Sequence, residues 1–153
     1  MLKKRQIAQE NKDQLVNVIA ELDQEKNRDV RATVKEVDQH FNSIFSVLLP
    51  GTKAMLEQIY DKANPELLIG LKLRVAFSGE WKESLSELSG GQRSLLALSL
   101  ILALLKYQPA PVYILDEIDS ALDLSHTQNI GLMIRKYFKS SQFVIVSLKE
   151  GLF

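Results

Sequence analysis

Two stretches of this sequence combine residue types that bind phosphate groups and metal ions. The first is Leu88-Ser89-Gly90-Gly91-Gln92, which opens the apolar run 95–105. A serine and two glycines at the start of a helix offer a hydroxyl, bare backbone N–H groups and the positive end of the helix dipole. The stretch therefore predicts a phosphate site at Ser89, Gly90 and Gly91, and a plain helix cap is the alternative interpretation.

The second stretch places two carboxylates at the end of an apolar strand. Residues 112–115 form a short apolar run, and Asp116 and Glu117 follow directly. Ligands of parallel sheets collect at the carboxyl ends of strands, where an ionised Asp116 suits a magnesium ion. Glu117, one residue further on, can reach a water molecule in line with a γ-phosphate. The alternative is that both are acidic residues at a helix start, which the helix dipole favours.

The expected lengths of the intervening elements separate these two stretches. A helix over residues 92–107 would run roughly 24 Å at 1.5 Å per residue. A strand over residues 112–116 would return only about 16 Å at 3.3 Å per residue. We therefore expect the glycine-rich start of the helix to lie beyond the carboxylates that end the strand. The two stretches then need not contact the same nucleotide.

The elements that must position these residues alternate between strands and helices. Period-two patterns predict half-buried strands, and short continuous apolar runs predict strands buried in a parallel sheet. A helix between two buried strands indicates a crossover unit. We expect an α/β fold with part of a sheet, flanked by helices. The predicted strands are 54–60, 71–77, 112–115 and 143–146, and the predicted helices are 92–107 and 124–139.

The N-terminal 42 residues contain no proline or glycine and mix charges of both signs. Apolar residues alternate four and three apart, which is a heptad seam and favours a coiled-coil helix over the alternative of a surface helix. The polar run 23–29 breaks the seam locally. No second heptad segment occurs in the sequence, so the partner helix is expected elsewhere. The seam residues are Val30, Val34, Val37, Phe41, Ile44 and Leu48.

Composition fits a folded protein. The chain has 153 residues, of which 46% are hydrophobic and 25% charged, and this excludes a disordered segment. Its formal net charge is zero, so bulk attraction to nucleic acid or to a membrane surface is not indicated. The lack of cysteine excludes disulfides and thiolate metal sites. The run 95–105 is too short to span a bilayer and no signal-peptide core follows Met1, so we expect a soluble intracellular protein without a membrane partner.

Three motifs resemble those of ABC-type ATPases. Residues 88–92 resemble the signature motif, residues 112–117 the Walker B strand with its catalytic glutamate, and residues 120–123 the D-loop. With a coiled-coil neck upstream, the wider run 85–95 resembles the C-terminal head lobe of the structural-maintenance-of-chromosomes (SMC) family. The resemblance covers nearly the whole chain. Within the family, the condensin branch is the most similar, on residues 121–131 and 147–151.

The resemblance implies an ATPase head that uses ATP and Mg²⁺. In this family the signature of one head presses on ATP held by a second head, so that two nucleotides are sandwiched. Carried over, Asp116 would help to hold magnesium and Glu117 would polarise the attacking water. Contacts to the partner's nucleotide and communication across the interface would come from Ser89, Gly90, Gly91, Gln92 and Asp123.

The resemblance also implies a domain plan and partners. Residues 1–42 would form the neck helix and residues 43–153 the C-terminal head lobe of a condensin SMC subunit. The partners would be the N-terminal half of the same head, a second SMC head, a kleisin subunit at the neck and DNA. Such a protein would organise chromosomal DNA into loops, and it would lie in the nucleus, on chromosomes and in the cytoplasm.

Two departures from the ABC pattern shape these expectations. No G-x-x-x-x-G-K-[ST] phosphate loop occurs in the sequence, so we expect the chain alone to be inactive. Leu148 stands where the ABC switch histidine is expected, which leaves that role to Ser147, to backbone groups or to nothing. His126 is expected to be a packing or surface residue. A DNA-repair ATPase of the same superfamily, a transporter nucleotide-binding domain and a non-catalytic dimerisation scaffold are the alternatives.

Overall fold

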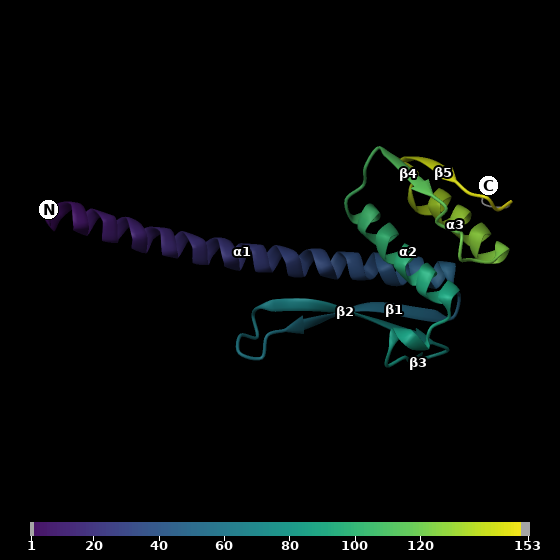
Figure 1. The fold of residues 1–153 in the computed structure, drawn as a ribbon, viewed down its shortest axis with the longest axis horizontal. Helices are drawn as coiled ribbons and strands as arrows, with labels where there is room; N and C mark the ends of the chain where they lie inside the picture. The colour runs from purple at the N-terminus through teal and green to yellow at the C-terminus, as the bar shows by residue number, and fades with distance from the viewer. Residues whose placement is uncertain (1, 151–153) are drawn as a thin grey trace.

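The computed structural model describes residues 2–150. It begins with one uninterrupted helix, α1 (Leu2–Leu48), which extends from the rest of the chain as a long rod (Figure 1). The polar run 23–29 does not interrupt the helix, because nothing in it prevents helical backbone geometry. The chain turns after α1 at Pro50 and Gly51, and Gly51 has a φ of 82°, in the left-handed region that glycine tolerates.

Burial divides α1 into two parts. In the outer part Leu15, Ile19 and Leu22 are exposed, and the described residues supply no partner for them. The inner part of the heptad seam is buried, and it packs within the chain against α2 (Gly90–Tyr107) and β1 (Thr52–Tyr60). The prediction that this inner spacing marks a coiled coil is therefore wrong, because the same spacing serves a helix on a globular core. The buried residues are Val34, Val37, Phe41, Ile44 and Leu48.

An antiparallel sheet covers one side of the inner end of α1 (Figure 1). Its order is β1-β2-β3, with β2 at Leu68–Phe77 and β3 at Glu80–Trp81. The predicted strands 54–60 and 71–77 are confirmed as β1 and β2, which begin two and three residues earlier than predicted. Ala54 and Val75 point into the core from this sheet.

The other side of the molecule holds a two-stranded parallel sheet. The strands β4 (Val112–Asp116) and β5 (Gln142–Val146) pair in parallel and are joined through α3 (Leu124–Tyr137), which confirms the predicted crossover. The prediction that both strands are buried on both faces is wrong. Tyr113 points into the core, whereas Ile114 is 75% exposed, because successive side chains alternate across a strand. One face of this sheet thus lacks cover from the described residues.

Helix α2 crosses the inner end of α1 and joins the two sheets into one core (Figure 1). Leu95 and Leu102 are fully buried between these elements. Its apolar composition predicts burial on several sides, but Ile101 and Leu104 are each 49% exposed. Part of its apolar surface therefore also lies uncovered. Among residues 2–150, no helix combines the length and apolar character that crossing a membrane requires.

The division of α1 predicts unequal costs for substitutions along one helix. Phe41→Ala should lower the free energy of unfolding by about 3–5 kcal/mol, because it leaves a cavity in the core. Leu15→Ala, at a side chain that is 63% exposed, should change it by less than about 0.5 kcal/mol. Chemical denaturation of both variants checks this. Equal costs would contradict the division into an exposed outer and a buried inner part.

Candidate functional site

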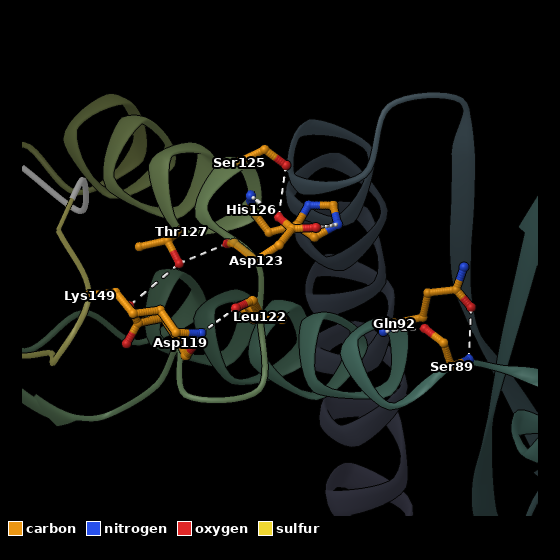
Figure 2. A network of polar contacts seen from close by, with 9 residues as sticks. All are labelled: Ser89, Gln92, Asp119, Leu122, Asp123, Ser125, His126, Thr127 and Lys149. Atoms are coloured by element: carbon orange, nitrogen blue, oxygen red, sulfur yellow. Dashed lines mark hydrogen bonds and ion pairs between the residues drawn. The ribbon is translucent and has the colours of Figure 1, made fainter.

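The start of α2 is held by a reciprocal pair of hydrogen bonds. Ser89 is the N-cap: its Oγ accepts from the backbone N–H of Gln92 at 3.2 Å, and its own N–H donates to Gln92 Oε1 at 2.9 Å. Figure 2 shows the two side chains at this helix end. The sequence left a cap as the alternative to a phosphate site, and the structure confirms the cap. A cap is compatible with anion binding, because the serine hydroxyl hydrogen and the Gln92 amide remain free to donate.

The first turn of α2 keeps backbone donors for a ligand. The N–H groups of Gly90 and Gly91 have no hydrogen-bond partner within residues 2–150, as the opening of a helix predicts. Gly90 is exposed, and a Cβ at its position would meet open space. The surface in front of these donors is therefore accessible to an anion, which the helix dipole would stabilise.

The loop between β4 and α3 lies against this helix end. A Cβ built at Gly91 would come within 3.5 Å of the carbonyl oxygen of Ala121. The structure therefore brings Gly91 of the first stretch next to Ala121 of the loop 120–123, although 30 positions separate the two residues in the sequence. Residues 120–123 are the connection between the glycine-rich helix start and the carboxylates that end β4.

Asp116 and Glu117 are both exposed where β4 ends. Asp116 is paired in register with Val146 of β5, and the N–H of Glu117 donates to the Val146 carbonyl at 2.9 Å. Glu117 has a φ of 45°, a left-handed conformation that costs a non-glycine residue about 1–3 kcal/mol and is typical of functional sites. No group of three His, Asp or Glu side chains that could hold a metal occurs among residues 2–150. A magnesium ion at Asp116 would therefore need ligands from the nucleotide or from another segment.

Asp123 caps the N-terminus of α3. Its Oδ1 accepts from the backbone N–H of His126 at 2.9 Å and from the Ser125 hydroxyl at 2.8 Å. These two hydrogen bonds, the first above all, hold the pKa of the exposed Asp123 carboxyl below its ordinary value. His126 Nε2 lies 3.7 Å from Asp123 Oδ2, and the ring is partly buried on α3. This agrees with its predicted role as a packing or surface residue.

A buried carboxylate that sequence reasoning did not single out lies behind this loop. Asp119 is 1% exposed, and its Oδ2 accepts from the Ser147 hydroxyl at 2.7 Å and from the Thr127 hydroxyl at 3.4 Å. Lys149 lies beside it (Figure 2). The parallel pairing of the two strands could have predicted this contact. Asp116 is paired with Val146, so residues 119 and 149, each three positions beyond its strand end, lie at the same edge of the sheet.

Residues 147 and 148, where the switch histidine is expected, lie next to these contacts of Asp119. The Leu148 side chain is 86% exposed and has no group that could bind a phosphate. Ser147, the other candidate for that role, already donates its hydroxyl hydrogen to Asp119 and accepts from the N–H of Lys149 at 3.0 Å. In this structure the Ser147 hydroxyl therefore binds Asp119 and the backbone of Lys149, and Leu148 offers no polar group.

A family model described as the RecF/RecN/SMC N terminal domain matches residues 2–153. The chain belongs to this RecF/RecN/SMC family. The description names an N-terminal domain, which is at odds with the C-terminal lobe that the resemblance implied, so the C-terminal assignment is not retained.

Individual SMC proteins are similar over the whole chain. The Structural maintenance of chromosomes protein 2 of Dictyostelium discoideum is 58% identical over 153 residues, and the chain spans only 13% of its length. The human Structural maintenance of chromosomes protein 2 is 54% identical over 156 residues, with 12% of its length spanned. The sequence expectation of similarity to the condensin branch therefore agrees with these relatives.

A solved SMC head shares the fold. It is the Smc head domain with an extended coiled coil, bound to the C-terminal domain of ScpA, derived from Pyrococcus furiosus. It has a TM-score of 0.79 and is 29% identical, with 98% of this chain and 37% of that chain covered. The mixed α/β fold with a long helix is therefore the fold of an SMC head.

The contact between Ser147 and Asp119 predicts a stability effect. Ser147→Ala should lower the free energy of unfolding by about 1.5–3 kcal/mol, because it removes a hydrogen bond to a buried carboxylate. Ser140→Ala, at an exposed serine in the turn before β5, is the matched control and should change it by less than about 0.5 kcal/mol. Urea denaturation measures both. A Ser147→Ala variant as stable as the control would show that the hydrogen bond contributes nothing.

The lowered pKa of Asp123 predicts how the cap of α3 responds to acid. Because the pKa in the folded state lies below that in the unfolded state, the cap stabilises the fold above about pH 4. That stabilisation is lost as the pH falls through the lowered pKa. Carboxyl chemical shifts followed by NMR should show Asp123 titrating below an ordinary aspartate, and Asp123→Asn should abolish this transition. A titration at or above the ordinary value would contradict the cap.

Proposed function

We propose that this chain is one lobe of the ATPase head of a condensin-type SMC subunit, the subunit that the Dictyostelium and human relatives represent. The observation that supports this most is the open start of α2. It presents two free N–H groups and lies against the loop 120–123. Such a surface is suited to closing over a phosphate group that another polypeptide segment holds.

The described residues fit ATP and Mg²⁺ by their chemistry. Asp116 offers an exposed carboxylate for the ion, which when bound neutralises phosphate charge. Glu117, which is also exposed there, would orient a water molecule and accept its proton. The backbone donors of α2 would contact the γ-phosphate of ATP on a second head, with Ser89 adding its hydroxyl hydrogen. Gln92 would hold the Ser89 cap, and Asp123 would fix the loop at the contact between heads.

A second segment must complete this head. The sequence has no phosphate loop, and the uncovered apolar face of the β4–β5 sheet offers a surface on which helices of a second segment would pack. We propose that the phosphate-loop half of the same subunit covers this face. On its own, the lobe then neither holds ATP tightly nor hydrolyses it.

The long outer part of α1 supports the proposed neck. Its exposed apolar residues leave a stripe for a partner helix of the coiled coil. The Pyrococcus head carries an extended coiled coil and is bound to a domain of ScpA. By analogy we propose that a kleisin subunit contacts this neck. In this proposal residues 1–42 form the neck and residues 43–153 form the head lobe. The assembled protein would act on chromosomal DNA in the nucleus.

A non-catalytic dimerisation scaffold is the alternative function of another class. The uncovered apolar faces of β4–β5 and α2 would serve such a scaffold equally well. The exposed carboxylate pair at the end of β4, with its strained Glu117 backbone, favours catalysis. A DNA-repair ATPase of the same superfamily would share these features and would differ in its partners.

Hydrolysis tests the catalytic assignment. The lobe should show no ATP turnover alone. Turnover should appear when it is combined with its phosphate-loop half and a partner SMC head. Glu117→Gln should lower that turnover at least about 100-fold with ATP binding retained, because it removes the group that accepts the proton. Turnover by the isolated lobe, abolished by Glu117→Gln, would contradict the two-segment proposal.

A bulky charge at the start of α2 tests the contact between heads. Ser89→Arg should block ATP-dependent head association, measured by size-exclusion chromatography or cross-linking, because it fills the space in front of the helix start. ATP binding to the single completed head should stay within about twofold of the wild type, a ratio worth less than about 0.5 kcal/mol. Loss of that binding would mean that Ser89 contacts the nucleotide of its own head.

A further inference from the structure

The ammonium group of Lys149 is bound by the backbone of the loop that follows β4. Its Nζ donates to the carbonyl oxygen of Asp119 at 2.7 Å, to that of Ser120 at 3.0 Å and to that of Leu122 at short range. An ammonium has three hydrogens to donate, so these three acceptors use all of them. Figure 2 shows the side chain reaching across to the loop from the segment after β5.

Other hydrogen bonds fix both ends of this connection. The N–H of Lys149 donates to Ser147 Oγ, and that hydroxyl donates to the buried carboxylate of Asp119. On the loop side, the N–H of Ser120 donates to the carbonyl oxygen of Glu117 at 3.1 Å. The ends of the two parallel strands are thus joined through one lysine and one serine. We call this arrangement the lysine clasp.

The lysine clasp lies between the proposed catalytic glutamate and the contact with α2. Glu117, Asp119 and Lys149 line the same cavity of about 130 Å³. The loop that Lys149 holds includes Ala121, whose carbonyl oxygen faces Gly91 at the start of α2. A change in this loop would therefore alter both the exit of the chain from Glu117 and the surface that meets the second head.

We infer that Lys149 is a positioning residue that fixes the loop 119–122 in the shape required for contact between heads. This inference rests on the proposed function. Lys149 acts through the loop backbone: all its ammonium hydrogens are engaged there, so none is left for a phosphate group. Its removal would leave the carbonyls of Ser120 and Leu122 without this donor, and that of Asp119 with only the N–H of Leu122. The loop would loosen, while the site that binds ATP on the phosphate-loop half would be unaffected.

The experiment uses the complete head, with its phosphate-loop half, and a partner SMC head. Lys149→Met keeps the length of the side chain and removes its donors. We expect ATP-dependent head association and turnover to fall about tenfold, with ATP affinity of the single head within twofold of wild type. Lys139→Met, which removes a charge at an exposed position after α3, is the matched control and should behave as the wild type.

Other outcomes overturn the inference. Wild-type association and turnover in Lys149→Met would show that the loop does not need the lysine. A parallel loss of ATP affinity would place Lys149 in nucleotide binding or general stability. If Lys149→Met fails to fold, Lys149→Arg is the variant to measure. Arginine keeps the positive charge, but the N–H donors of its planar guanidinium cannot converge on three carbonyls. We expect about threefold weaker association with unchanged ATP affinity, and unchanged association would overturn the inference.

Failure of this inference can be distinguished from failure of the proposed function. If the wild-type head pair shows no ATP-dependent association or turnover, the proposed function fails. If the wild-type pair is active and the Lys149 variants match it in every measurement, only the positioning role of Lys149 fails.

Discussion

The parallel pairing of β4 with β5 is the constraint on which the candidate site depends. Because the two strands run in the same direction and in register, both chains leave the sheet at one edge. That edge collects the exposed carboxylates, the buried Asp119 and the segment 147–149, which lie about thirty positions apart in the sequence. A hairpin would have placed the same residues at opposite ends. The helical crossover through α3 is therefore what makes a shared site geometrically available.

The core that supports this edge is organised by the inner end of α1. Phe41, Ile44 and Leu48 are fully buried, with the antiparallel sheet on one side and α2 on another. Helix α2 connects this core to the site, because it buries Leu95 and Leu102 in the core and begins at the Ser89 cap. The glycine-rich turn is thus held by a rigid, buried element, which preorganises its free N–H groups before any ligand binds.

The sequence predicted the features that depend on local pattern, and it missed those that depend on long-range placement. The crossover, the hairpin strands and the cap-forming start of α2 follow from periodicity and residue type. The inner seam of α1 was misassigned because a heptad spacing does not reveal whether its partner is another helix or a mixed core. The exposed face of Ile114 could not be read from an apolar run, since such a run does not report how much of its sheet the chain contains. Lys149 was missed because its acceptors are backbone carbonyls, which carry no residue signature.

One consequence concerns mechanics. The 47 residues of α1 form a single helix that is roughly 70 Å long at 1.5 Å per residue, and the described chain has no break or hinge between its exposed outer part and its buried inner part. Torque or bending applied to the outer end is therefore delivered to the packing around Phe41 and Phe45. A lever of this kind converts a small rotation at the core into a large displacement at its tip. A rotation of α1 at the core would thus change the direction in which the rod points.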